Sequence, residues 1–347
     1  MHICVRIRVM EIVFVHLNTP VPKYLRHNLE TTISRFPEHQ VTLLHNVITN
    51  APQISKLKRY LVNMDSRWKR LDSLYSHPKE FRGNFWLTSS ARLFALEDYI
   101  DREKVEIIHV ESDVILSPDF PFDKFRELKK SLAFPIISNE RGVASVVYVR
   151  NGDAARILTS TLIEEATKNS QTTEMLSLRK VYENNSKHIQ LLPIGLDDSR
   201  MYRNIDLNMI QELRKAQHIF NGTFDGVEIG QYFSGTDPRN RRGQVLIRHD
   251  LANGYIDIAK LMLDFDAKRN FVNVKSKNEP HITSRLFSLH VPVKQSRFFK
   301  AASQGKSLMD ISSQSRNGRK QEISFQVAFR SAIVSGLRRI KKRLKLG

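Results

Sequence analysis

Two carboxylates stand near the end of an apolar run in the sequence VEIIHVESDVI, residues 105–115. The run predicts a buried strand. Side chains two positions apart in a strand point to the same face, so Glu111 and Asp113 would project together. Such a pair can hold a hard divalent cation, because Mg²⁺ binds oxygen ligands and shares its coordination with substrate phosphates. The pair suggests a site for a diphosphate-bearing substrate. The structural alternative is two solvated acids in a turn after a strand.

The segment ESD, residues 111–113, resembles the Asp-x-Asp element of GT-A-type nucleotide-sugar glycosyltransferases, with Glu in place of the first Asp. The resemblance implies that Glu111 and Asp113 bind Mn²⁺ or Mg²⁺. A second stretch, FDGVEIGQYFSGTDPRN at residues 224–240, closely resembles a run in glycosyltransferases of bacterial capsule and lipopolysaccharide synthesis. Its glycines and proline predict a shaped loop of the kind that carries binding residues. The resemblance makes Asp225 and Asp237 candidate catalytic residues, and capping of the turn before Pro238 is the alternative for Asp237.

A third stretch, LHVPVK at residues 289–294, is similar to the terminal His and Lys motif of the same enzymes. The resemblance implies that His290 approaches the metal and that Lys294 approaches the diphosphate. An imidazole suits Mn²⁺ better than Mg²⁺, and an ammonium offsets charge on a departing diphosphate. The sequence departs from the motif at Pro292 and Val293, where the family has His and Ser. A His between apolar residues can also be a satisfied core residue.

Further candidates follow from the same resemblance. Glu174, in the sequence QTTEM, matches an acidic residue at a helix N-terminus near the donor sugar, which makes it a candidate for the acceptor side. Its alternative is an ordinary first-turn acid that the helix dipole favours. Asn18, after the first predicted strand, and Arg92, on the helix before the ESD segment, are the candidates for binding the nucleotide. A solvated Arg on a helix face is the alternative for Arg92.

The elements that must position these residues alternate along the chain. The apolar patterns predict strands at 11–17, 40–44, 132–137 and 144–149, and helices at 22–36, 84–100 and 124–130, the last with Asp123 as N-cap. Residues 51–80 show no clear period. Alternating strands and helices predict an α/β fold with a mostly parallel sheet flanked by helices, and ligands bind such sheets beyond the carboxyl ends of the strands. With the resemblance, this implies a GT-A-like, Rossmann-type fold.

The charge of the chain is concentrated at its C-terminal end. Residues 294–347 contain 14 Lys or Arg and 2 Asp or Glu, a net charge of +12 out of +19, which leaves +7 for the first 293 residues. Apolar residues recur every three or four positions from Phe325 to Leu344 among these bases, which predicts a basic amphipathic helix on an anionic membrane surface. We therefore expect a glycosyltransferase domain at 1–299, a linker at 300–320 and this helix at 321–347. The alternatives for the tail are a helix packed on the domain and a nucleic-acid-binding segment.

The single cysteine, Cys4, excludes a disulfide within the chain and fits a reducing cytoplasm. No segment has the roughly 18 apolar residues of a membrane span. We expect a cytoplasmic protein at the inner face of the cell membrane that transfers a sugar from a nucleotide-diphosphate sugar to a lipid-linked saccharide acceptor, for a surface polysaccharide or lipopolysaccharide. The alternatives are a catalytically degenerate binding protein of the same fold at the membrane and, ranked last, a nucleic-acid-binding protein.

Overall fold

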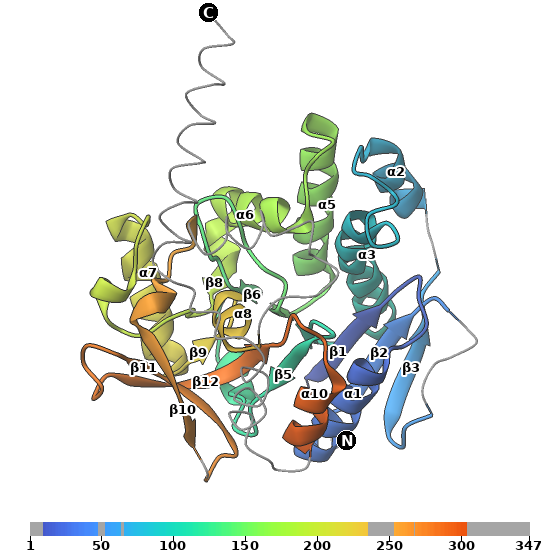
Figure 1. Ribbon diagram of the computed structural model, residues 1–347. Helices are drawn as coiled ribbons and strands as arrows, with labels where there is room; N and C mark the ends of the chain where they lie inside the picture. The colour runs from blue at the N-terminus through green and yellow to red at the C-terminus, as the bar shows by residue number, and fades with distance from the viewer. Residues whose placement is uncertain (1–9, 48–52, 64–65, 235–252, 267, 304–347) are drawn as a thin grey trace, which may run out of the picture.

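The computed structural model describes residues 10–47, 53–63, 66–234, 253–266 and 268–303. It is a mixed α/β fold (Figure 1). The elements, in chain order, are β1 (Glu11–His16), α1 (Lys23–Arg35), β2 (Val41–His45), β3 (Leu57–Leu61), α2 (Ser66–Leu74), α3 (Phe85–Glu103), β4 (Ile107–Val110), β5 (Val114–Leu116), α4 (Phe122–Arg126), β6 (Leu132–Phe134), β7 (Val146–Val149), α5 (Gly152–Lys168), α6 (Glu174–Asn185), β8 (Ile189–Leu191), α7 (Leu207–Phe220), β9 (Thr223–Phe224), α8 (Glu228–Ser234), β10 (Leu261–Asp266), β11 (Phe271–Ser276), β12 (Thr283–His290) and α10 (Ser296–Ser303).

The main sheet has seven strands in the order β3-β2-β1-β4-β7-β6-β8. Neighbouring strands run parallel except at β7, which is antiparallel to both β4 and β6. Most of its central strands are buried on both faces, as expected for a sheet covered on both sides. The predicted α/β fold with a mostly parallel sheet flanked by helices is confirmed.

Helices cover both faces of this sheet because successive strand side chains point to opposite sides. On β1, Val13 and Val15 belong to one apolar cluster, which includes residues of α3, α5 and α6. Ile12 and Phe14 belong to a second cluster, which includes Leu25 and Leu29 of α1. Figure 1 shows α3, α5 and α6 on one side of the sheet and α1 with α10 on the other.

A smaller sheet, in the order β10-β11-β12-β5, lies beside the main one, and β9 also pairs with β12. The strand β5 follows β4 after a short turn and pairs antiparallel with β12, so that His290 is opposite Val114. The two sheets therefore meet at the turn between β4 and β5, which contains Glu111 and Asp113.

Several helix and strand boundaries in the structure differ from those predicted from the sequence. The predicted continuous strand at 105–115 is wrong: β4 ends at Val110, and a turn closed by the Val114 N–H and the Glu111 carbonyl oxygen, 3.0 Å apart, separates it from β5. The short helix α4 begins at Phe122, so Asp123 lies in its first turn and is not the N-cap. Residues 51–80, for which the sequence shows no clear period, contain β3 and α2.

At the C-terminal end, α10 continues to Ser303, so the first residues of the predicted linker are helical. The rest of that linker and the predicted helix at 321–347 lie outside the described residues. Within the described part of the chain, no helix is long and apolar enough to cross a membrane.

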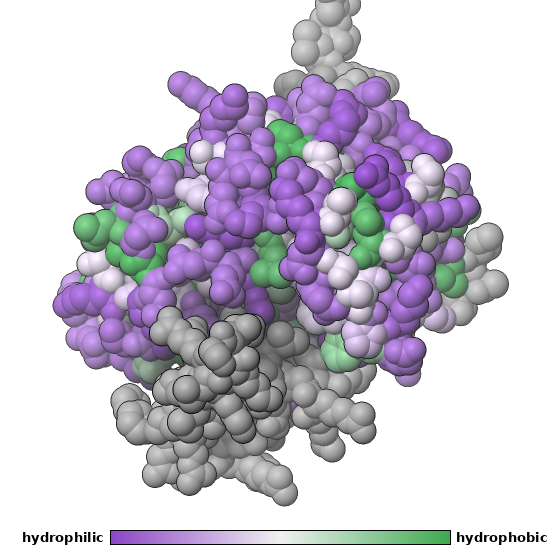
Figure 2. Space-filling model, turned by 90° about the horizontal axis from the view of Figure 1, so that it is seen from above, coloured by the Kyte–Doolittle hydropathy of each residue, from purple (hydrophilic) through white to green (hydrophobic). Residues whose placement is uncertain are grey.

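The face seen in Figure 2 is mostly hydrophilic, and its hydrophobic residues occur in small separate groups. The large hydrophobic side chains that are exposed among the described residues are Leu61, Leu207 and Met262, from distant parts of the chain. Single exposed apolar residues of this kind are ordinary on a folded protein.

Candidate functional site

A side chain of α1 supports the turn between β4 and β5 through hydrogen bonds. Asn28 is buried, and its Nδ2 donates to the carbonyl oxygens of Ser112 and Val114, at 3.1 and 2.7 Å. The Glu111 N–H donates to the carbonyl oxygen of Ser145, at 3.1 Å. These bonds fix the backbone of the turn, so the side chains of Glu111 and Asp113 project together into a cleft although they do not belong to a strand.

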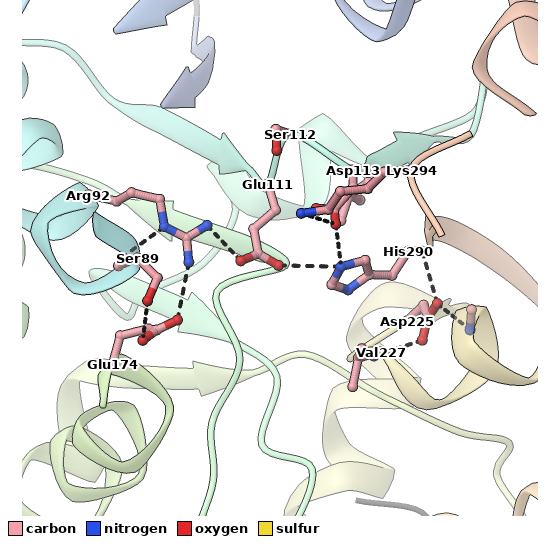
Figure 3. Close-up of polar contacts among 12 residues, drawn as sticks. Ser89, Arg92, Glu111, Ser112, Asp113, Glu174, Asp225, Val227, His290 and Lys294 are labelled. Atoms are coloured by element: carbon pink, nitrogen blue, oxygen red, sulfur yellow. Dashed lines mark hydrogen bonds and ion pairs between the residues drawn. The ribbon is translucent and has the colours of Figure 1, made fainter. Parts of the chain in front are cut away.

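The imidazole of His290 reaches the same point from the end of β12. Its Nε2 lies 3.3 Å from Oδ2 of Asp113 and 3.8 Å from Oε2 of Glu111. Figure 3 shows the three side chains converging from the turn and from the smaller sheet. One potential ligand atom from each residue lies within 4.8 Å of the other two. Residues that the sequence analysis took from two separate motifs are thus brought together.

The donor set of these three residues fits a divalent cation. Two carboxylates and an imidazole suit Mn²⁺, and a metal would bind the imidazole in its neutral form. Nδ1 of His290 is buried and has no hydrogen-bond partner among the described residues, so the ring is oriented by its Nε2 contacts and by its backbone. The three side chains Glu111, Asp113 and His290 are hereafter called the acid–histidine cluster.

Cations neutralise the acids of this cluster. Lys294 places its Nζ 3.2 Å from Oδ2 of Asp113. Burial alone would raise the pKa of Asp113, but Lys294 and His290 hold that pKa far below its usual range. Burial would lower the pKa of His290, whereas the carboxylates of Asp113 and Glu111 raise it to about 9. These neighbours hold Asp113 in its ionised form, which is the form that can ligate a metal ion.

Arg92 links Glu111 to Glu174. Its guanidinium donates to Oε1 of Glu111 at 2.6 Å and to Oε1 of Glu174 at 3.3 Å. The hydroxyl of Ser89 donates to Oε2 of Glu174 at 2.9 Å. Burial opposes charge on Arg92, but the two carboxylates raise its pKa above the ordinary value. Arg92, predicted to bind the nucleotide, thus lies between two acids and is only partly exposed (Figure 3).

Glu174 is the first residue of α6, after the N-cap Thr173, whose hydroxyl accepts from the Leu176 N–H. Its carboxylate is buried, and this burial raises its pKa although Arg92 and Ser89 act in the opposite direction. The side chain is directed at Arg92 and lines the same cleft as the acid–histidine cluster. An acid with a raised pKa beside a ligand cleft is a candidate for proton transfer.

Asn18, predicted to bind the nucleotide, lies just after β1 with a left-handed backbone, φ 64°. Its Nδ2 donates to the hydroxyl of Thr88 at 3.0 Å, and its Oδ1 accepts from Nδ2 of Asn46 at 2.8 Å. Asn18 lines the cleft at the carboxyl end of β1, where ligands of parallel sheets are found.

Asp225 occupies a different kind of position. It is fully buried, and both of its carboxylate oxygens accept main-chain N–H groups, one of them that of His290. Burial raises the pKa of Asp225 to about 6, against the effect of His290 and the amides. The structure does not test a catalytic role for Asp225. The other predicted catalytic acid of this motif, Asp237, lies outside the described residues.

The cleft that these residues line has a volume of about 310 Å³. Besides the residues above it is lined by aromatic and basic side chains before and within α3 that the sequence analysis missed: Phe81, Arg82, Phe85 and Trp86. A larger cleft of about 620 Å³ lies among α2, α3 and α5, and its described lining contains none of the predicted site residues. The predicted chemistry is therefore concentrated in the smaller cleft.

Asn28 was also missed, although the sequence contains a signal for it. It lies between Leu25 and Leu29 on the apolar face of α1, where a polar residue must find a partner. The partner, the backbone of the turn at 112–114, is distant in sequence and could not have been named.

Comparison with models of protein families and with curated protein sequences gave no match. Solved structures of glycosyltransferases align with part of the chain. The galactosyltransferase LgtC, in complex with donor and acceptor sugar analogs, aligns over 58% of this chain and 82% of its own, with 13% identity and a TM-score of 0.41. Mouse xyloside xylosyltransferase 1 aligns over 53% and 85%, with 10% identity and a TM-score of 0.35. The bifunctional glycosyltransferase WbbM aligns over 62% and 45%, with 10% identity and a TM-score of 0.34.

Proposed function

We propose that this protein is a metal-dependent glycosyltransferase that transfers a sugar from a nucleotide-diphosphate sugar to a saccharide acceptor. The observation that carries the proposal is the acid–histidine cluster with Lys294, in a cleft at the carboxyl ends of parallel strands. Oxygen and imidazole ligands beside an ammonium suit a diphosphate that is bound together with a divalent cation.

Seven residues of the cleft have a role in this proposal. Glu111, Asp113 and His290 would hold Mn²⁺ or Mg²⁺. When bound, the cation would supply positive charge for the diphosphate of the donor. Lys294 orients the diphosphate and offsets its charge, since its Nζ already lies at the edge of the cluster. Asn18 lines the end of the cleft where the nucleoside of the donor would bind.

The acceptor hydroxyl would approach from the side of Glu174. Glu174 is the candidate base for this hydroxyl, because its carboxylate lines the cleft and burial raises its pKa above the ordinary value, which makes it a better proton acceptor. Arg92 keeps Glu174 and Glu111 apart as two separate acids, with one guanidinium nitrogen donating to each. Asp237 is a second candidate for this base, on the evidence of the sequence alone.

The test is a donor screen with the full-length protein in Mn²⁺. A panel of nucleotide-diphosphate sugars is assayed by thermal shift and then for release of the nucleoside diphosphate. We expect one donor to raise the unfolding temperature and to be turned over, and Asp113→Asn to abolish both effects because the cluster loses a charged ligand. The control is Asp123→Asn, an exposed acid on α4 that is not among the residues lining the cleft.

Two other outcomes would favour one of the alternative functions. Donor binding that depends on Asp113 but gives no turnover with any acceptor would favour a binding protein on the same fold. Nucleic-acid binding that persists in Asp113→Asn and weakens steeply with salt would favour the nucleic-acid reading of the basic tail.

The acceptor class and the location also belong to this proposal. We infer a lipid-linked saccharide at the inner face of the cell membrane, for a surface polysaccharide or lipopolysaccharide. The support is the basic amphipathic sequence at 321–347 and the motif at residues 224–240, both from the sequence.

A further inference from the structure

The buried acid Asp225 contacts the backbone that carries His290, one member of the acid–histidine cluster. It lies in the loop between β9 and α8, fully buried, with its carboxylate directed at the end of β12 (Figure 3). An acid so close to a proposed metal site would ordinarily be assigned as a ligand or a base. Its hydrogen bonds indicate a different role.

Four main-chain amides donate to this carboxylate. Oδ1 accepts from Val227 at 2.9 Å and Ile229 at 3.1 Å, and Oδ2 accepts from Gly230 at 2.7 Å and His290 at 2.9 Å. An ionised carboxylate has about four acceptor positions. The amides fill them, which leaves no lone pair for a sugar hydroxyl or a cation.

One of these amides belongs to His290 itself. The Asp225 N–H in turn donates to the carbonyl oxygen and to the hydroxyl of Ser288, each at 3.2 Å. Asp225 is thus bonded to β12 both at His290 and two residues before it. Gly230 completes the contact, since a Cβ at that position would overlap the carbonyl oxygen of His290. The first residues of α8 and the end of β12 are joined through one carboxylate.

We propose that Asp225 is a positioning residue that holds the imidazole of His290 against Glu111 and Asp113 by binding the backbone of His290. The inference rests on the proposed function, because it assigns Asp225 to the support of that metal site. It also explains Gly230 of the motif, which packs against this carboxylate and the carbonyl oxygen of His290.

The experiment measures binding of Mn²⁺ alone, by electron paramagnetic resonance of the free ion, with full-length proteins. Four proteins form a double-mutant cycle: the wild type, Asp225→Asn, His290→Ala and the double variant. Asparagine keeps the size of the side chain but replaces an acceptor oxygen by an NH₂ group that faces amide donors. We expect Asp225→Asn to weaken Mn²⁺ binding about tenfold, as for other residues that orient metal ligands.

In the His290→Ala background, the same Asp225→Asn change should alter Mn²⁺ affinity less than about twofold, because no imidazole remains to be positioned. Glu97→Gln is the matched control. Glu97 is also a buried carboxylate, bonded to Thr159 and Arg67 between α3 and α5 and away from the cluster. This control should lower the unfolding temperature and leave Mn²⁺ affinity unchanged.

Equal Mn²⁺ affinity of the wild type and a folded Asp225→Asn protein would overturn the inference and leave the proposed function standing. So would an equal loss in the presence and absence of His290. Failure of the proposed function is seen separately, as a wild type that does not bind Mn²⁺ at all. If Asp225→Asn does not fold, Ser288→Ala removes the hydroxyl that accepts from the Asp225 N–H and leaves the carboxylate unchanged, and its effect on Mn²⁺ affinity should show the same dependence on His290.

Discussion

At the residue scale, the acids of the cleft differ in what contacts their oxygens. Glu111 gives one oxygen to Arg92 and turns the other toward His290, whereas Asp113 faces two cations, His290 and Lys294. Within the described part of the chain, the hydrogen bonds to the Asp225 carboxylate come from main-chain amides. Residue type alone does not separate these roles, which depend on neighbours that are distant in sequence.

Arg92→Gln tests the neutralisation of these two acids. Removal of the guanidinium leaves the buried Glu174 and the partly buried Glu111 without this cation, so we expect a loss of about 3 kcal/mol in the free energy of unfolding. Urea unfolding measures this loss. Saturating Mn²⁺ should recover part of it, because the metal supplies charge to Glu111.

The control for this variant is Arg102→Gln on the same helix. Arg102 forms an exposed ion pair with Asp98 one turn away, and its loss should cost less than about 0.5 kcal/mol. Equal losses in the two variants would show that Arg92 contributes no more than a surface charge.

The sequence was informative about which residue types gather in the cleft. Two of the motifs supplied Glu111, Asp113, His290 and Lys294, and the structure places His290 within ion-pair distance of both acids and Lys294 within ion-pair distance of Asp113. It could not show that the guanidinium of Arg92 would be held by two acids, because those contacts link α3 to a turn and to α6.

At the scale of elements, the β4–β5 turn determines where the carboxylates point. Alternating apolar residues at 105–115 predicted one strand, and the two side chains do project together. The reason is different: a turn supported by α1 and β12 directs them. Periodicity could not reveal this turn, because the residues on both sides of it are apolar and buried.

Asn28→Ala tests that support. The substitution leaves the carbonyl oxygens of Ser112 and Val114 without their donor in a buried place, which should cost about 2 kcal/mol of stability. A looser turn should also weaken Mn²⁺ binding, measured by calorimetry. Asn151→Ala, which removes the N-cap of α5, should cost about 1 kcal/mol and leave Mn²⁺ affinity unchanged.

A second prediction at this scale concerns acid pH. Asp119, after β5, pairs with Arg269 at 2.6 Å. Burial acts to raise its pKa, but bonds from Arg269 and Ser117 lower it below the ordinary value. The carboxylate should therefore contribute stability that is fully present above its unfolded pKa of about 3.9 and is lost as the pH falls through the lower folded pKa.

Urea unfolding of the wild type and Asp119→Asn measures this contribution. With solvent screening of a half-buried pair, the difference should be about 1 kcal/mol at pH 7. It should shrink below pH 4, where the wild type also becomes protonated. A difference that grew on acidification would contradict the ion-pair assignment.

At the scale of the whole molecule, the described residues form a mixed α/β fold, and residues 304–347 carry 11 Lys or Arg against 2 acids, a net charge of +9 out of +19. This concentration of charge is read from the sequence directly, because blocks of like charge are visible without any long-range contact. The pairing of β12 with β5 was not predictable in the same way, since it joins segments far apart in the chain.

The tail gives a prediction for the intact chain. Lys341 and Lys342 lie in the basic segment, and each base near an anionic bilayer contributes about 1 kcal/mol. Replacement of both by Gln should weaken co-sedimentation with vesicles rich in anionic lipid by about 30-fold. The control replaces Lys69 and Arg70, two exposed bases of α2, by Gln and should change binding little. Equal effects of the two pairs would argue against a specific membrane segment.

The residues of the candidate site come from segments that are far apart in the chain. Glu111 and Asp113 leave the ribosome early, whereas His290 and Lys294 emerge only after β12 has been made. Domains fold as their segments emerge, so a half-synthesised chain has the acids without the imidazole and the ammonium. A shortened product that ends before residue 283 would keep most of the main sheet but would lack His290 and Lys294, so the proposed metal site could form only after β12 has been made.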